Sequence, residues 1–188
     1  MKEYEFKLIK WLDSYKKTCK YNLSNSGMPE PDLKEYGIDT SYDHFLSGGN
    51  EIDYKLRQTI GDLYGYGSEN VLLTIGGSEA IFIVSSFLSM KAGKMIIPLP
   101  EYEPMFLAPQ SLGMKTYMGE TDLIRDKIDS DSALSFTNPN NPSGNMRGRN
   151  EIISSSGNAK YIYVDETFRN FSFPAGLKTE FDGTDRLI

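Results

Sequence analysis

Short β-prone runs alternate with helical stretches after residue 70, and this alternation constrains the fold more than any other feature of the chain. The runs expected to form strands are Val71–Ile75, Lys94–Leu99, Met114–Met118, Ser132–Phe136 and Tyr161–Val164. The stretches expected to form helices are Ser78–Met90, Met105–Leu112, Asp122–Ile128 and Arg149–Ser155. Such a pattern predicts an α/β fold with a mostly parallel sheet and helices on both of its faces. Residues 186–188, RLI, should begin one more strand.

The part before residue 70 has a different character. Apolar residues recur at helical spacing between residues 3 and 17, which predicts an amphipathic helix. A stretch rich in Asn, Ser and Pro follows at residues 21–32 and should be a loop. A second helix is expected at Glu51–Leu63. We therefore expect an N-terminal arm over residues 1–40 and one larger domain over residues 41–188.

Composition and charge argue against several classes of protein. The net charge of −6 disfavours a nucleic-acid partner, which requires clustered basic residues. No apolar run approaches the ~20 residues of a membrane span. Cys19 is the single cysteine, and the N-terminus does not resemble a secretion signal, so a cytoplasmic location is expected. His44 is the single histidine, which leaves no residue set for a metal site or a histidine-based triad.

Polar residues follow four of the predicted strands. GGSEA begins at Gly76 after the first strand, and Tyr102 follows the second. Asn141 comes after SALSF, and Asp165 directly follows YIYV. Ligands bind open α/β sheets outside the carboxyl ends of the strands. We therefore expect these four segments to meet at one ligand-binding edge.

The GGSEA turn joins a predicted strand to a predicted helix. Its glycines permit a tight turn, and the free N–H groups at a helix start attract phosphate together with the helix dipole. Ser78 could add a hydroxyl donor. The turn has neither the GxGxxG nor the Walker pattern, so a nucleotide is not favoured. An ordinary N-capping turn is the alternative interpretation.

The motif NPNNPSG, residues 138–144, is the most specific signal in the chain. Two X-Pro bonds restrict its backbone and could hold the Asn141 amide against a ligand oxygen. The Tyr102 ring could stack on a flat heteroaromatic ligand, or it could be a packing residue. Asp165 ends a buried run, where a carboxylate is costly unless it is paired. A protonated pyridine nitrogen would be a suitable partner, and a structural salt bridge or helix cap is the alternative.

Together these features resemble class I/II aminotransferases of fold type I, which use pyridoxal 5′-phosphate (PLP). The histidinol-phosphate aminotransferase and threonine-phosphate decarboxylase branch is the most similar in style. The resemblance runs from about residue 22 to residue 188 and includes NEIDYKLRQTIGDLYGYGSENVLLTIGGSEAI. It implies the three-layer large domain of that fold, incomplete at its C-terminus, in a homodimer. It also implies amino-group transfer between an L-amino acid and a 2-oxo acid.

The resemblance assigns cofactor contacts first to the turn and the aromatic residue. Gly77, Ser78 and Glu79 would border the phosphate of PLP, and Tyr102 would stack on its pyridine ring. Phe168 would also border the cofactor. The family usually has Tyr at this position, whose hydroxyl touches the 3′-oxygen, and Phe cannot make that bond. Phe occurs there in the decarboxylase-like branch, so decarboxylation of an amino-acid phosphate is an alternative activity.

The remaining assignments concern the polar contacts. Asn141 would hydrogen-bond the 3′-oxygen, and Asp165 would pair with the ring nitrogen as the catalytic residue that makes PLP an electron sink. Ser26 and Gly27 would contact the substrate in an N-terminal loop. Tyr42 is the candidate for a tyrosine that reaches the phosphate of the partner subunit.

The resemblance also implies a Schiff-base lysine after the next strand, which we expect just beyond Ile188. Lys178 comes before that strand and is not a candidate. The 188-residue form is therefore expected to have little or no turnover, although it could still hold PLP noncovalently. A noncatalytic fragment or pseudoenzyme that acts by association is the alternative from another functional class.

Overall fold

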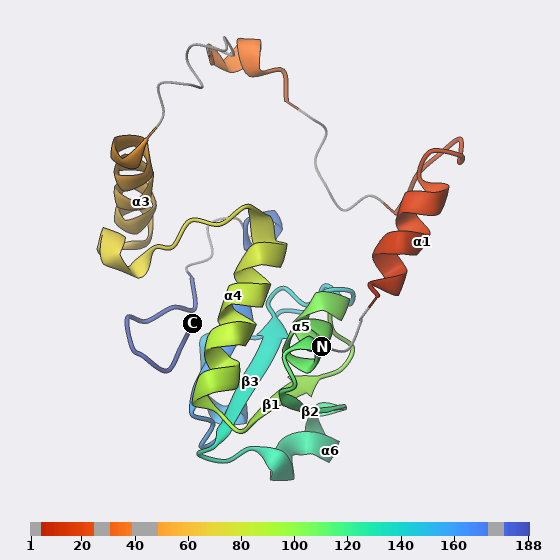
Figure 1. Ribbon diagram of the computed structural model, residues 1–188, viewed down its shortest axis with the longest axis vertical. Helices are drawn as coiled ribbons and strands as arrows, with labels where there is room; N and C mark the ends of the chain where they lie inside the picture. The colour runs from red at the N-terminus through yellow and green to blue at the C-terminus, as the bar shows by residue number, and fades with distance from the viewer. Residues whose placement is uncertain (1–4, 25–30, 39–48, 173–178) are drawn as a thin grey trace. The chain divides into compact units, whose positions relative to one another are not determined.

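A computed structural model describes residues 5–24, 31–38, 49–172 and 179–188 (Figure 1). Ser26, Gly27, Tyr42 and His44 lie outside the described residues. The chain divides into two compact units, Lys7–Leu73 and Thr74–Ile188, with Met1–Phe6 assigned to the second. The expected division at residue 40 between an arm and a large domain stays a prediction.

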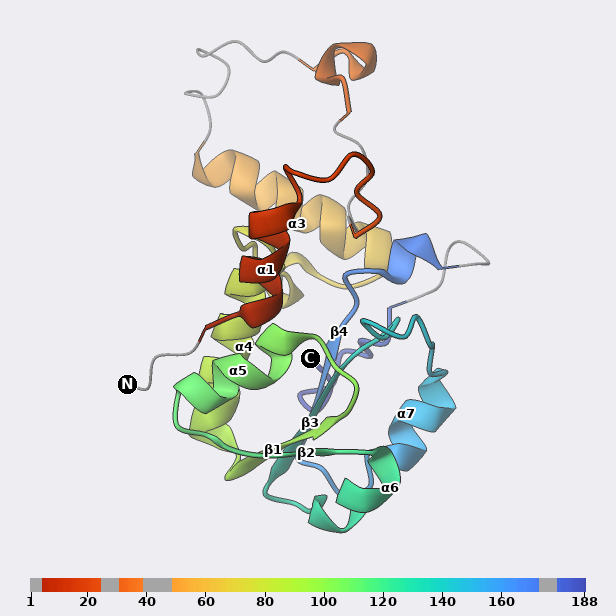
Figure 2. The ribbon, with the colours of Figure 1, turned by 90° about the vertical axis from the view of Figure 1, so that its right-hand side faces the viewer.

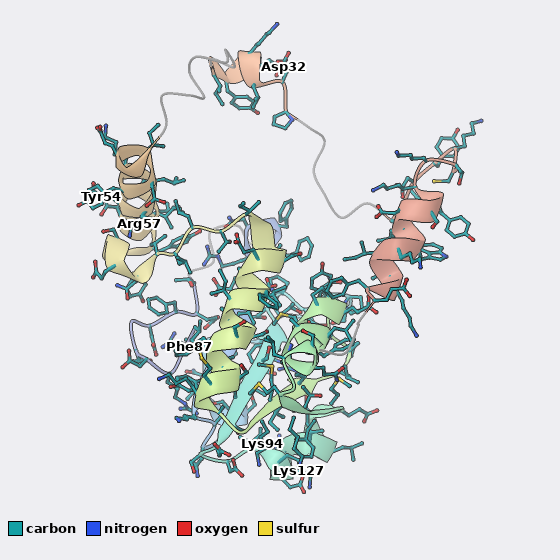
Figure 3. The ribbon with its side chains drawn as sticks, viewed as in Figure 1. Asp32, Tyr54, Arg57, Phe87, Lys94 and Lys127 are labelled. Atoms are coloured by element: carbon teal, nitrogen blue, oxygen red, sulfur yellow. The ribbon has the colours of Figure 1, made fainter. Side chains whose placement is uncertain are left out.

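The first unit contains two α-helices, α1 (Lys7–Tyr15) and α3 (Asn50–Tyr64), within its described residues. Both predicted helices are confirmed. On α3, Arg57 Nε donates to Asp53 Oδ2 at 2.9 Å, an exposed pair one helical turn apart (Figure 3). A short 3-10 helix at Leu33–Tyr36 begins after Asp32, whose carboxylate accepts the N–H of Lys34.

The second unit is built on four parallel strands in the order β2-β1-β3-β4. The strands are β1 (Lys94–Pro98), β2 (Lys115–Gly119), β3 (Ser132–Thr137) and β4 (Tyr161–Asp165). The chain end also runs parallel to β4, since Ile162 donates to the Arg186 carbonyl at 2.7 Å and Ile188 donates to the Ile162 carbonyl at 2.9 Å. Residues 186–188 thus form an isolated parallel bridge to β4, and the additional strand expected there stays a prediction.

Helices cover both faces of this sheet (Figure 2). One face carries α4 (Gly76–Lys91) and α5 (Glu103–Ser111), and the other carries α6 (Thr121–Ile124) and α7 (Arg149–Ser155). Every residue of β3 is buried, as expected for a central parallel strand covered on both sides. The predicted three-layer α/β architecture is confirmed.

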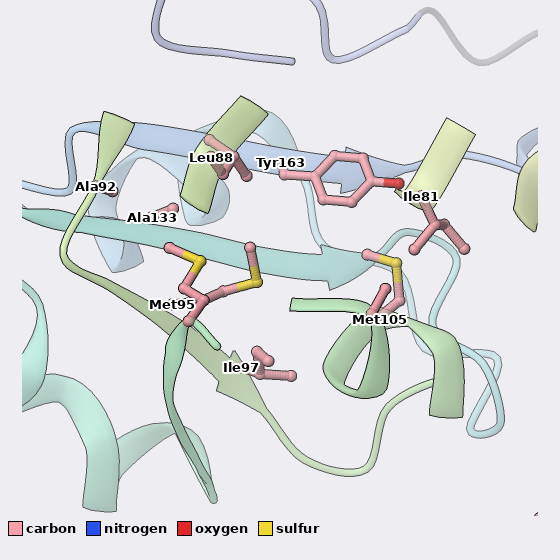
Figure 4. Packing of buried hydrophobic residues seen from close by; sticks show 10 residues of the cluster. Ile81, Leu88, Ala92, Met95, Ile97, Met105, Ala133 and Tyr163 are labelled. Atoms are coloured by element: carbon pink, nitrogen blue, oxygen red, sulfur yellow. The ribbon is translucent and has the colours of Figure 1, made fainter. Parts of the chain in front are cut away.

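The core divides between the two faces because side chains alternate along each strand. Met95 and Ile97 of β1 pack with Leu88 of α4 and Met105 of α5 (Figure 4). Ile96, between them in sequence, packs on the opposite face. Tyr163 of β4 belongs to the α4 and α5 side, and so the next residue but one, Asp165, ends β4 on that same side.

The prediction of a strand at Val71–Ile75 is wrong. This segment has no strand partner among the described residues, and Leu72 and Ile75 are 70% and 91% exposed. High β-propensity does not make a strand unless a neighbouring segment supplies the ladder of hydrogen bonds.

In the described part of the chain, no helix combines the length and the apolar character needed to cross a bilayer.

Candidate functional site

The segments that follow β1, β3 and β4 meet at the carboxyl edge of the sheet. Thr137, the last residue of β3, is the register partner of Asp165, the last residue of β4. The N–H of Asn138 donates to the Asp165 carbonyl at 2.8 Å. The N–H of Thr137 donates to Glu101 Oε2, beyond β1, at 2.8 Å. The structure therefore brings together the segments that contain Tyr102, Asn141 and Asp165.

Asp165 is partly buried, and its carboxylate is only partly engaged. Its Oδ1 accepts the N–H of Thr167 at 2.9 Å. No ion pair joins Asp165 to any residue that the structure describes. Burial raises the pKa of the nearby Tyr163 hydroxyl, and the charges of Asp165 and Glu101 raise it further. The edge thus holds two acids whose charges no described basic residue neutralises.

The three asparagines of NPNNPSG have different environments. The Asn138 side chain donates to the Arg147 carbonyl at 3.0 Å and accepts the Arg147 N–H at 2.9 Å. The Asn140 amide donates to the Pro100 carbonyl at 3.1 Å. The Asn141 side chain is partly buried and makes no hydrogen bond to a described residue. Of the three, Asn141 is the one whose amide is available to a ligand.

Tyr102 is the residue immediately before α5. Its N–H donates to Glu101 Oε1 at 2.7 Å, and its ring packs against the core cluster under α4 and α5. Burial raises the pKa of its hydroxyl, and the charges of Asp165 and Glu103 raise it further. The ring is thus a packing residue near Asp165, and stacking on a ligand stays a prediction.

The glycine turn begins α4 with Gly76 at φ +79°, a left-handed conformation that favours glycine. No side chain caps the helix start from the N-cap position. The Glu79 carboxylate instead accepts the N–H of Ile75, so it forms a hydrogen bond within the turn itself. Ser78 is exposed, and its hydroxyl has no hydrogen-bond partner within the described residues. The arrangement leaves Ser78 and the helix start available to an anion.

The glycine turn lies close to the end of β4. A Cβ atom placed on Gly77 would lie 3.8 Å from Thr167 Oγ1, and it is the N–H of Thr167 that Asp165 accepts. One residue thus links the start of α4 to the Asp165 carboxylate. This proximity is what a ligand requires if it presents an anionic group to α4 and a cationic group to Asp165.

The turn after β4 is fixed by an ion pair. Glu166 pairs with Arg169 at 2.7 Å, and its other oxygen accepts the N–H of Glu180 at 2.6 Å. Phe168 is partly buried and packs edge-to-face on Phe171, with ring centroids 6.1 Å apart. Phe168 therefore offers an apolar ring and no hydroxyl in the turn that follows Asp165.

Sequence reasoning missed Glu101, which is 8% exposed. Burial raises the pKa of its carboxyl, and the hydrogen bonds that it accepts from Thr137 and Tyr102 oppose this effect. The charge of Asp165 adds to the increase. The available signal was an acidic residue placed between a buried strand and Tyr102, but the sequence does not reveal which partner it meets across the sheet.

No protein-family model matches the chain. The chain is similar to histidinol-phosphate aminotransferase 2 of Archaeoglobus fulgidus, with 26% identity over 146 residues, which is 73% of this chain and 42% of the relative. The chain thus spans less than half the length of that relative.

Solved structures share the fold. A PLP-dependent aminotransferase from Streptococcus suis matches with a TM-score of 0.69 and 19% identity, over 100% of this chain and 57% of that one. The L-threonine-O-3-phosphate decarboxylase of Porphyromonas gingivalis matches with a TM-score of 0.59 and 18% identity, over 72% of this chain and 42% of that one. The chain therefore has the fold of part of a PLP-dependent transferase.

Proposed function

We propose that this chain carries the cofactor-binding part of a PLP-dependent aminotransferase that transfers an amino group between an L-amino acid and a 2-oxo acid. One observation carries the proposal: Asn141, with an unpartnered amide, and Asp165, with no described cation, follow neighbouring strands at one sheet edge. The similarity to a histidinol-phosphate aminotransferase supports the same assignment.

The residues at this edge fit the polar groups of PLP. Asp165 would pair with the cationic pyridine nitrogen, which compensates the cost of a partly buried carboxylate. The Asn141 amide would donate to the 3′-oxygen. The start of α4, with Gly77 and Ser78, would bind the phosphate through N–H groups and the helix dipole. The short path from Gly77 through Thr167 to Asp165 allows one ligand to meet all of these groups.

When bound, PLP supplies an electron sink for the bond that breaks at the amino acid's α-carbon. The residues of this chain would control that property. Asp165 would hold a proton on the ring nitrogen. Asn141 would fix the ring's in-plane orientation, and Tyr102 and Phe168 would cover it and exclude water. Lys94 and Lys115 begin their strands at the opposite edge of the sheet, so neither is nominated as the Schiff-base lysine that the reaction needs.

The substrates and partners belong to the whole protein. The name of the Archaeoglobus relative makes histidinol phosphate the first amino donor to test, with a 2-oxo acid as the acceptor. A homodimer, with Ser26 and Gly27 in the substrate loop, completes the proposal. Turnover should be assayed on the longest form of the protein that the genomic reading frame encodes.

Decarboxylation of an amino-acid phosphate is a second candidate because Phe168 lacks the hydroxyl that the family's usual Tyr supplies. The two reactions give different products. Released carbon dioxide from an amino-acid phosphate would support decarboxylation, whereas a new 2-oxo acid would support transamination. PLP binding with neither product for any donor would support the noncatalytic alternative.

Thermal unfolding of the chain tests the cofactor directly. A ligand that binds only the folded state at about 100 times its Kd should stabilise that state by about 2.7 kcal/mol. We expect PLP to raise the melting temperature more than pyridoxal, which lacks the phosphate, or inorganic phosphate at equal concentration. Equal effects of PLP and pyridoxal would exclude α4 as the phosphate site. No effect of PLP on melting or on its own absorbance would reject the cofactor assignment.

A further inference from the structure

A single hydroxyl at the end of β3 connects two of the candidate ligand contacts. Thr137 Oγ1 donates to Glu101 Oε1 at 2.6 Å and accepts the N–H of Asn141 at 2.9 Å. Glu101 Oε1 also accepts the N–H of Tyr102 at 2.7 Å. A continuous series of hydrogen bonds therefore runs from the backbone of Tyr102, through Glu101 and Thr137, to the backbone of Asn141.

The second carboxylate oxygen strengthens this connection. Glu101 Oε2 accepts the N–H of Thr137 at 2.8 Å, and the Asn140 amide approaches it at 3.5 Å. Donors thus approach both oxygens, and two of those donors are backbone N–H groups that cannot accept a bond. A carboxylate satisfies them all, whereas a carboxamide would turn one N–H group toward another. Thr137 is also the register partner of Asp165, so it lies beside the end of β4.

A buried acid at this position is costly for the fold. Burial and the charge of Asp165 oppose ionisation of Glu101, and Tyr102, Glu103 and Tyr163 are the other titratable groups nearby. An apolar residue here would remove the cost of burying the acid but would leave the N–H groups of Tyr102 and Thr137 without this acceptor. Chains keep such groups where they specify one geometry. The geometry specified here is that of the two segments that carry Tyr102 and Asn141.

We propose that Glu101 and Thr137 form a clasp that positions Tyr102 and Asn141 relative to each other and thereby sets the affinity of the site for its flat, anionic ligand. The identity of that ligand as PLP rests on the proposed function. Both members of the clasp are positioning residues, because they act through the residues they hold.

Matched substitutions separate the hydroxyl from the shape of the side chain. Thr137→Val removes the hydroxyl and keeps the branched shape, and Thr137→Ser restores the hydroxyl. Thr116→Val is the control, because Thr116 Oγ1 on β2 accepts one side-chain hydrogen bond, from Gln110 at 2.9 Å. Glu101→Gln tests the other half of the clasp, and Glu151→Gln on the exposed side of α7 is its control.

The first arm uses the ligand-free chain and measures amide hydrogen exchange by NMR. In Thr137→Val and Glu101→Gln, exchange at the N–H groups of Tyr102 and Asn141 should accelerate together by about tenfold or more. Thr137→Ser and both controls should exchange as the native chain does. Unchanged exchange at either amide in both variants would overturn the clasp, whatever the chain does with PLP.

The second arm measures the affinity for PLP and the circular dichroism that the protein induces in it. Thr137→Val and Glu101→Gln should each weaken binding about tenfold and change the induced signal, and the double variant should lose little more than either single variant. Full additivity, or native affinity with a native signal, would overturn the positioning role. Failure of the native chain itself to bind PLP would reject the proposed function, while the exchange experiment would still decide whether the clasp exists.

Discussion

The N–H of Asn138 donates a 2.8 Å hydrogen bond to the carbonyl oxygen of Asp165. This bond joins the NPNNPSG motif to the end of YIYVD, the two most specific signals in the chain. Because β3 and β4 are parallel and Thr137 is the register partner of Asp165, the bond also fixes how far each segment extends beyond the sheet. Asn141 and Asp165 therefore follow adjacent strands at the same edge of the sheet.

Alanine substitutions at Asn138 and Asn141 should affect different properties: the first should lower stability, and the second should weaken PLP binding. Asn138→Ala removes two hydrogen bonds to the Arg147 backbone and should lower the free energy of unfolding by about 1–3 kcal/mol. Asn141→Ala removes an amide with no described partner and should change it by less than about 0.5 kcal/mol. The same Asn141→Ala variant should bind PLP about tenfold more weakly.

Urea unfolding and PLP titration of both variants test this contrast. A strongly destabilised Asn141→Ala chain would show that this amide supports the fold. Native affinity of Asn141→Ala for PLP would remove Asn141 from the site.

The core on the α4 face should respond to truncation according to burial. Leu88 is fully buried between α4 and the sheet, so Leu88→Ala should cost about 2–5 kcal/mol of stability. Met90 on the same helix is 74% exposed, and Met90→Ala should change stability by less than about 0.5 kcal/mol. Chemical denaturation of the pair is the measurement. Equal losses would mean that α4 packs with a different face than described.

Alanine substitutions at Gly76 and Gly77 should have different effects, because Gly76 has a left-handed backbone conformation and Gly77 does not. Gly76 has φ +79°, so Gly76→Ala should destabilise the chain by about 1 kcal/mol or more. A Cβ on Gly77 meets only ordinary contact with Thr167, so Gly77→Ala should fold normally. Its methyl group would nevertheless lie at the start of α4, where we propose that the phosphate binds. Gly77→Ala should therefore weaken PLP but not pyridoxal in parallel titrations, and equal weakening of both would place the phosphate elsewhere.

The raised pKa of Glu101 gives a pH dependence with a definite sign. A carboxyl whose pKa is higher in the folded state contributes stability that is fully present below the unfolded pKa, here 4.5. That contribution is lost as the pH rises through the raised pKa of the folded state. The free energy of unfolding of the native chain minus that of Glu101→Gln should therefore decrease as the pH rises. Urea unfolding from pH 4 to 8 measures it, and an increase with pH would show that the pKa of Glu101 is lowered.

The sheet and its helices could be predicted from the sequence because local pattern and tertiary structure agree there. The predicted limits of α7 and β3 agree closely with the structure. β3 is buried along its whole length, and α7 buries Ile152 on one side. Residues 71–75 also have high β-propensity, but no strand that the structure describes pairs with them, so the pattern alone gave a wrong prediction. Periodicity describes one segment and cannot report whether a partner exists.

The candidate site shows the same division. The positions of Asn141 and Asp165 at one sheet edge could be predicted because each follows a recognisable strand, and parallel strands end at one edge. Glu101 and Thr137 were missed because their importance lies in a bond across 36 positions of sequence. Such a pair becomes visible only when the register of β1 and β3 is known.

The most direct test of the central claim compares the affinity for PLP of the native chain, Asp165→Asn and Asp126→Asn. Asp126 is an exposed acid just after α6, away from the α4 side of the sheet where Asp165 lies. Asp126→Asn removes the same charge and is therefore the control. If Asp165 pairs with the cationic ring nitrogen, Asp165→Asn should bind PLP about tenfold to a hundredfold more weakly, and Asp126→Asn should bind it as the native chain does. Native affinity in Asp165→Asn would contradict the assignment of this carboxylate to the cofactor.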